Sequence, residues 1–246
     1  MPAPAHAQAV PSDHAIVLLP RSDFSLSWSH LGTDDPRFAW DAVVVVDLDV
    51  LGYGANRLKL WADYEAVLGR ERRPFDLNHE NYSIEVSAAH RFGAIDVAAG
   101  LHHTSRHLDD RASLSVVAWN VAVVEASRQM TLGRSIVDAE VALGAVTGRT
   151  YVDYTWTGNL RLAVRRSVSE HVSLYALGAG GMVGVDPEKA GRTERQCGGL
   201  LESGVRIRGR TGALDLYVGY ERRVDAYPLD RTRVRWTTVG FRLGTK

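Results

Sequence analysis

Apolar and polar residues alternate with a period of two along most of the chain, from about residue 22 to the C-terminus. Between residues 38 and 50 an apolar side chain occupies every even position, and Asp41, Asp47 and Asp49 fall on odd ones. A helix would repeat its apolar positions three and four residues apart, whereas successive strand residues point to opposite faces. The pattern therefore predicts half-buried β-strands and no amphipathic helix.

The predicted strands are long and number about twelve, and many have ten or more residues. Strands of soluble proteins average about five or six residues, and membrane-spanning strands need about nine to eleven. Charges of both signs occupy the polar face of nearly every strand, which suits the lumen of a membrane barrel. We therefore expect an all-β fold: a single closed antiparallel transmembrane β-barrel of about 12 strands, covering residues 15–246.

The links between the predicted strands alternate between long, charged segments and short ones. The long set is LGTDDPR, GRERRPFDLNHE, RHLDDR, VDPEKAGRTER and VDAYPLDRT, and the short set is GYGAN, a turn at Phe92-Gly93, SRQM, RSVSE and GRT. The link near Gly148 is short although it belongs to the long set. Barrels of the Gram-negative outer membrane have long loops outside and tight turns in the periplasm. This asymmetry predicts an outer-membrane location with both termini in the periplasm.

Aromatic residues gather at the predicted strand ends. Phe38, Trp40, Tyr151, Tyr154 and Trp156 lie near long links, and Phe92 and Phe241 lie near short turns. Such rings are typical of the two water–lipid interfaces. About twelve strands enclose a narrow bore, so we expect the interior to be largely plugged.

Composition narrows the classes of function. Lysine plus arginine equals aspartate plus glutamate at 29 each, which argues against a nucleic-acid partner. A single cysteine, Cys197, excludes an internal disulfide, and no run reaches the roughly 18–20 apolar residues of a membrane-spanning helix. The expected partners are outer-membrane lipids, with Arg70, Arg72 and Arg73 of a long loop facing anionic lipopolysaccharide.

The first residues, MPAPAHAQAV, contain the small-x-small pattern Ala7-Gln8-Ala9 of a signal-peptidase site. No charged or apolar segment of a signal peptide precedes it within the sequence. Residues 1–14 are accordingly interpreted as the remainder of a signal peptide or as a disordered tail.

The segment GLHHTSRHLDD, residues 100–110, concentrates the candidate chemistry. It follows a strand whose lipid face includes Leu101, so His103 and Ser105 should point outward near the outer leaflet. His102, Thr104 and Arg106 should point into the lumen. A histidine and a serine two positions apart on one strand face lie about 6–7 Å apart. The histidine could then act as the base that activates the serine hydroxyl for acyl transfer.

The triplet His103-Thr104-Ser105 resembles the His-x-Ser motif of two kinds of outer-membrane lipid hydrolase, phospholipase A and lipid A 3-O-deacylase. The resemblance implies a serine esterase that hydrolyses acyl esters of phospholipid or lipid A, with His103 as base and Ser105 as nucleophile. The deacylase has an asparagine directly after its serine, where this chain has Arg106. Candidates for the third catalytic group are Asn120, Glu125, Asp109 and Asp110. A tight hairpin would place Asn120 several residues along the neighbouring strand.

The same segment also resembles the signature of an uncharacterised outer-membrane barrel family, a domain of unknown function. That signature runs glycine, tyrosine or histidine, serine, serine, histidine, glycine, aspartate; Arg106 and Asp109 replace the second serine and second glycine. The C-terminal GYERRVDAYPLDRTRVRWTTVGFRL resembles the ending of that family. The resemblance implies a fold and a location.

Other interpretations of the histidine segment remain open. His103, His107 and Asp110 could bind Zn²⁺ or Ca²⁺ at the rim; apart from this metal no cofactor is expected. The segment could instead be a polar rim that stabilises a loop. The whole chain would then be a non-enzymatic narrow channel or a structural membrane protein. A soluble all-β binding protein is the third class.

Overall fold

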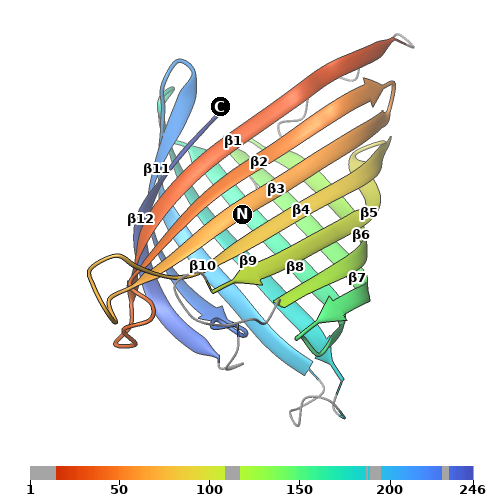
Figure 1. Cartoon of the computed structure of the whole chain (residues 1–246). Helices are drawn as coiled ribbons and strands as arrows, with labels where there is room; N and C mark the ends of the chain where they lie inside the picture. The colour runs from red at the N-terminus through yellow and green to blue at the C-terminus, as the bar shows by residue number, and fades with distance from the viewer. Residues whose placement is uncertain (1–14, 109–116, 187, 189–194, 229–232, 246) are drawn as a thin grey trace.

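The computed structural model describes residues 15–108, 117–186, 188, 195–228 and 233–245. In this part of the chain, twelve antiparallel strands form one closed barrel, which confirms the predicted fold (Figure 1). The strands are β1 (Ile16–Gly32), β2 (Trp40–Tyr53), β3 (Asn56–Gly69), β4 (Asp76–Phe92), β5 (Ile95–His107), β6 (Val117–Leu132), β7 (Ser135–Thr150), β8 (Tyr154–Ser167), β9 (Val172–Val185), β10 (Arg195–Arg208), β11 (Gly212–Arg223) and β12 (Val234–Thr245). No helix among the described residues is long and apolar enough to cross a membrane.

Each strand pairs with its neighbours in sequence, and β1 closes the ring against β12. The closing register runs from Ser25 opposite Gly244 to Gly32 opposite Thr237. Closure leaves no strand edge with unpaired backbone groups, which a strand in contact with hydrocarbon requires. The longer links gather at one end of the barrel and the short turns at the other (Figure 1).

Three of the short turns have two residues each and begin with Gly54, Gly93 and Gly133. Each of these glycines has a positive φ of 55–61°, which tight hairpin turns of this kind demand and which a side chain disfavours. The turn predicted at SRQM was wrong, because β6 continues to Leu132. Ser127 and Gln129 face the lumen, where Gln129 donates a hydrogen bond to Asp138 at 2.6 Å. The predicted link GRERRPFDLNHE also shortens, because β4 begins at Asp76.

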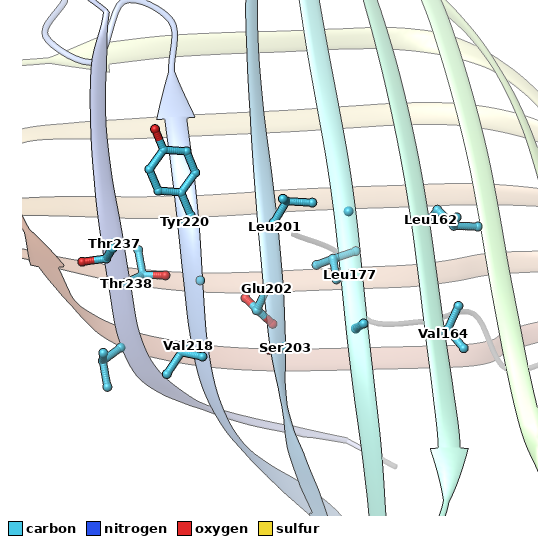
Figure 2. A pocket seen from close by; sticks show the side chains of 14 residues that line it. Leu162, Val164, Leu177, Leu201, Glu202, Ser203, Val218, Tyr220, Thr237 and Thr238 are labelled. Atoms are coloured by element: carbon cyan, nitrogen blue, oxygen red, sulfur yellow. The ribbon is translucent and has the colours of Figure 1, made fainter.

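The outward face of the barrel is apolar and exposed. Leu101, Leu143, Leu160, Leu201 and Val239 are each 61–66% exposed, although they are large aliphatic residues. A continuous band of this kind is what hydrocarbon contacts in a membrane barrel. A shallow groove of about 630 Å³ crosses this face over β8–β12, and Figure 2 shows Leu162, Leu201 and Val218 along it. In the strand register Gly178 lies between Leu162 and Leu201, and Ser203 lies beside Val218.

Aromatic rings flank the apolar band at both ends. At the long-loop end Trp28, Trp40 and Phe75 pack together with ring centroids 5.8–6.2 Å apart. At the short-turn end Phe92 and Phe241 face outward. These rings confirm two predicted belts.

Two of the predicted belt residues point inward instead. Phe38 precedes β2, and its ring packs in the lumen 5.3 Å from that of Trp236. Tyr154 is 6% exposed and donates a hydrogen bond to Asp225 at 2.5 Å. The prediction was wrong for both, because a loop that folds into the barrel offers a ring a buried site on the other side of the wall.

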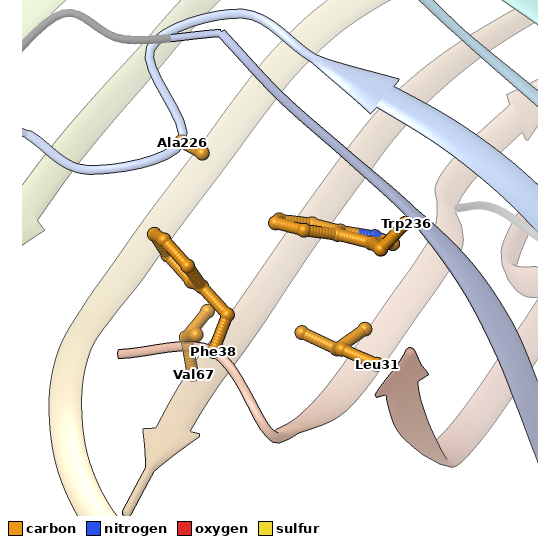
Figure 3. Packing of buried hydrophobic residues seen from close by; sticks show 5 residues of the cluster. All are labelled: Leu31, Phe38, Val67, Ala226 and Trp236. Atoms are coloured by element: carbon orange, nitrogen blue, oxygen red, sulfur yellow. The ribbon is translucent and has the colours of Figure 1, made fainter. Parts of the chain in front are cut away.

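The long-loop end of the lumen is filled by an apolar cluster. It consists of Leu31, Phe38, Val67, Ala226 and Trp236, each at most 2% exposed (Figure 3). An arginine of β5 binds the loop after β11 inside the barrel. Arg106 donates hydrogen bonds to the carbonyl oxygens of Asp225 at 2.6 Å and Ala226 at 3.3 Å. The expected plug is therefore present at this end of the interior, whereas the rest of the lumen is hollow.

The rest of the lumen encloses a cavity of about 880 Å³. The cavity extends from the short turns at Gly54 and Gly93 to Trp119 and Tyr154. Charged side chains of both signs line it and pair with one another near the turns, where Arg91 lies 2.8 Å from Asp96. The lumen is thus polar, with a hollow that faces the short-turn end.

Replacing Phe38 by alanine should lower the free energy of unfolding by about 3–5 kcal/mol, because it removes a ring from a closely packed cluster. Urea unfolding followed by tryptophan fluorescence measures this change. Phe92→Ala removes the same ring from an exposed position and should cost less. Equal losses in the two variants would contradict a stabilising role for the plug.

Candidate functional site on the lipid-facing side of β5

The outward face of β5 carries His103, Ser105 and His107 at the long-loop end. Their orientation follows from their neighbours. His103 lies opposite Ile84 of β4, and Ser105 lies opposite Tyr82. Both partners are exposed on the apolar face, whereas the intervening Thr104 is buried on the lumen side. The predicted alternation of this segment is confirmed.

Asn120 of β6 is the direct cross-strand partner of His103. Its Oδ1 lies 2.7 Å from the Nδ1 of His103. An amide oxygen can only accept, so Nδ1 carries the proton and Nε2 is left as an acceptor. The expectation that Asn120 lies several residues away was wrong. β5 ends at His107 and β6 begins at Val117, so the hairpin is not tight and the register moves Asn120 to His103.

Ser105 has a histidine on each side along the strand. Its Oγ lies 3.3 Å from the Nε2 of His107, and the ring of His107 meets the edge of Tyr82 at a centroid distance of 5.2 Å. Within the described part of the chain Ser105 makes no hydrogen bond with His103. The contact with His107 was not foreseen, although its two-residue spacing from Ser105 equals that of His103.

A buried carboxylate lies next to this cluster. Glu80 has the same outward parity as Tyr82, yet it is only 9% exposed. It accepts hydrogen bonds from the hydroxyl of Tyr64 and, at 3.1 Å, from that of Tyr82. Glu80 lies opposite His107 in the register of β4 and β5. The sequence signal was a single charged residue in phase with Tyr82, Ile84 and Val86 on a lipid-facing strand.

The opposite face of β5 points into the lumen. His102 stacks on Trp61 at 5.6 Å and lies 3.3 Å from Glu85, and its Nε2 is 3.0 Å from the hydroxyl of Thr104. Glu125, another candidate third group, lines the lumen cavity and pairs in register with Ala98. The sheet separates it from His103, so that candidate was wrong.

The metal interpretation stays a prediction. Among the described residues no three His, Cys, Asp or Glu side chains are grouped so that they could hold a metal ion. Asp109 and Asp110 lie outside the described residues. The predicted site of His103, His107 and Asp110 is therefore represented only by its two histidines.

The fold resembles those of solved outer-membrane barrels. The outer membrane phospholipase A of Escherichia coli aligns with a TM-score of 0.56 and 14% identity, over 93% of both chains. An active-site mutant of that phospholipase, with alanine in place of an asparagine, aligns with a TM-score of 0.55 and 14% identity, over 98% of this chain and 94% of that chain. The NanC porin aligns with a TM-score of 0.54 and 10% identity, over 91% of this chain and 99% of that chain. At these identities the likeness concerns the fold.

Comparison of the sequence with protein-family models and with curated proteins finds no match. The resemblance to an uncharacterised barrel family thus stays a prediction. The closed barrel, its apolar band and its likeness to solved outer-membrane barrels agree with one another. The chain is an integral β-barrel of the Gram-negative outer membrane.

Asn120→Ala should reduce the share of the Nδ1–H tautomer of His103, because the ring loses the oxygen that accepts this proton. Nitrogen-15 NMR of the histidine rings in detergent measures the tautomer. Asn159→Ala, which removes an asparagine from the lumen, is the control and should leave His103 unchanged. An unaltered His103 in the Asn120 variant would contradict the orienting role.

Proposed function

We propose that this protein is an outer-membrane lipid hydrolase that cleaves an acyl ester of phospholipid or lipid A at the outer leaflet. The observation that carries the proposal is the hydrogen bond of 2.7 Å between His103 and Asn120 on the lipid-facing side, with Ser105 two positions away on the same face. Nucleophile, base and orienting group are the three parts that serine-based acyl transfer requires.

The residues would act as follows. Asn120 holds the Nδ1–H of His103, so Nε2 is free to take the proton of Ser105 as its oxygen attacks the ester carbonyl. His103 then gives this proton to the leaving alcohol, and an acyl-enzyme remains on Ser105. Water, activated by the same histidine, releases the fatty acid and restores the serine.

In the resting arrangement the hydroxyl of Ser105 lies beside His107 rather than His103. A rotation about the Cα–Cβ bond of serine, which has three staggered positions, would bring the hydroxyl to His103. We assign the base to His103 because Asn120 fixes its tautomer. His107 is the alternative base. The variants below distinguish the two histidines by the activity that each replacement removes.

The position of the cluster suits a lipid ester. Ile84 lies beside His103 on the same outward face, and Leu101 lies two residues closer to the middle of the barrel wall. They are 46% and 65% exposed. Acyl chains that contact this band would hold their ester groups near the long-loop end, beside Ser105. The similar fold of a phospholipase, and the asparagine in that phospholipase's active site, support this proposal. A non-enzymatic barrel is the competing interpretation.

Ser105→Ala should lower the rate of fatty-acid release from phospholipid or lipid A by at least about a thousandfold, because no other group replaces the nucleophile. Free fatty acid from mixed micelles and the mass of extracted lipid A measure this rate. Ser83→Ala on the lumen side of the adjacent strand is the matched control and should retain activity. If neither lipid is hydrolysed by the wild type, the barrel is not a lipid hydrolase.

His103→Ala should reduce kcat by about 10²–10⁴-fold, the usual contribution of a general base. Asn120→Ala should reduce it less, because the base is still present but its orientation is lost. His107→Ala should retain most of the activity. The reverse order, with His107→Ala as the inactive variant, would assign the base to His107 instead.

A further inference from the structure

The lumen cavity has a binding site's dimensions and is separate from the histidine cluster. Its volume of about 880 Å³ falls in the range of about 300–1,000 Å³ that small-molecule sites occupy. The apolar cluster around Phe38 and Trp236 fills the long-loop end of the barrel. A solute would therefore reach the cavity from the short turns at Gly54 and Gly93, which line its other end.

Aromatic side chains line the deep part of the cavity. Trp119 of β6 meets Tyr154 edge to face with ring centroids 5.3 Å apart, and Trp61 of β3 stacks on His102. All four residues line the cavity. The indole N–H of Trp61 is buried and has no hydrogen-bond partner within the described part of the chain. An occupant with a hydrogen-bond acceptor would satisfy that donor.

Carboxylates exceed cations in the same region. Glu85, Glu125 and Glu140 all line the cavity, and Glu140 lies diagonally across the β6–β7 pair from Glu125. Two cations lie beside this group: the Nζ of Lys59 is 4.0 Å from Glu125, and Arg161 is the cross-strand neighbour of Glu140. By contrast, arginines at the short-turn end of the cavity are in closer ion pairs, such as Arg91 with Asp96 at 2.8 Å.

The opposite wall is small and uncharged. The lumen-facing positions of β9 and β10 include Ala179, Gly181, Gly198 and Leu200. A Cβ atom at Gly198 would lie 2.7 Å from the carbonyl oxygen of Arg222, and one at Gly181 would lie 3.2 Å from the Oδ1 of Asn159. Glycine at these positions keeps the wall flat, which leaves room for an apolar body across from the tryptophans.

We propose that this cavity binds a small organic ammonium ion from the periplasmic side, with its cationic head between Trp61, Trp119 and Glu125. Indole faces attract cations, and more so when the site is shielded from water. The carboxylates supply the countercharge, and the flat wall accepts the alkyl substituents. The Trp61 N–H donates a hydrogen bond to a hydroxyl or carbonyl oxygen of the ligand.

Three isosteric probes test the charge preference: choline, its neutral analogue 3,3-dimethylbutan-1-ol, and the anion 3,3-dimethylbutanoate. Isothermal titration calorimetry and quenching of tryptophan fluorescence are measured on the full chain in a non-ionic detergent, because phosphocholine headgroups would compete. Choline should bind at least about tenfold more tightly than either analogue, since only the cation gains the ring and carboxylate attraction.

Variants locate the site. Glu125→Gln and Trp119→Leu should each weaken choline binding by about tenfold or more. Glu202→Gln is the matched control, because Glu202 is a lumen carboxylate that pairs with Arg242 at 2.9 Å and lies outside the cavity lining. Heat-modifiable migration on gels verifies that each variant is folded.

Equal binding of the three probes, preference for the anion, or absence of choline binding would overturn the proposal. Choline binding that Glu125→Gln and Trp119→Leu leave unchanged would also overturn it, because the cation would then bind elsewhere.

Discussion

The contact between one face of every strand and hydrocarbon is the constraint on which the rest of this structure depends. Hydrocarbon offers no hydrogen bonds, so every backbone N–H and C=O in the membrane must be paired within the sheet. The pairing of β1 with β12 meets this demand by leaving no free edge. The exposed leucines and valines of the outer face are stable for the same reason, since lipid replaces the protein core that would otherwise cover them.

Because the barrel is closed, the polar side chains on the inner face of each strand lie in a confined lumen. Charges there cannot all reach bulk water, so they pair with each other: Arg223 contacts Asp41, Glu65 and Glu221 within 3.2 Å. The loops at one end complete the interior with an apolar cluster around Phe38 and Trp236. A barrel of this size thus needs no separate plug domain, and what remains is a hollow that faces the short turns.

The same constraint makes polar side chains on the lipid-facing surface informative. A histidine, a serine or an asparagine there gains nothing from hydrocarbon and needs a partner at the interface. His103 is hydrogen-bonded to Asn120, and Ser105 to His107. Glu80 accepts hydrogen bonds from Tyr64 and Tyr82. The cluster lies where ester groups of membrane lipids would be accessible, and the lumen cavity lies on the other side of the wall. The two proposed sites would therefore meet different solutes from different compartments.

Alternation determined the strand faces and the outward orientation of His103 and Ser105, because the period of a strand is a local property of the backbone. The lengths of the strands and of the links between them added the closed membrane barrel. The glycines of two tight turns and most of the link lengths were also predictable, apart from the turn at Gly133 and the link before β4, which is shorter than expected. Only the tertiary structure showed the contacts between segments that are far apart in the chain. The register between β5 and β6 brings Asn120 to His103, the inward fold of two loops buries Phe38 and Tyr154, and the packing of two tyrosines buries Glu80. Such contacts join residues that are far apart in the chain, and no local pattern encodes their geometry.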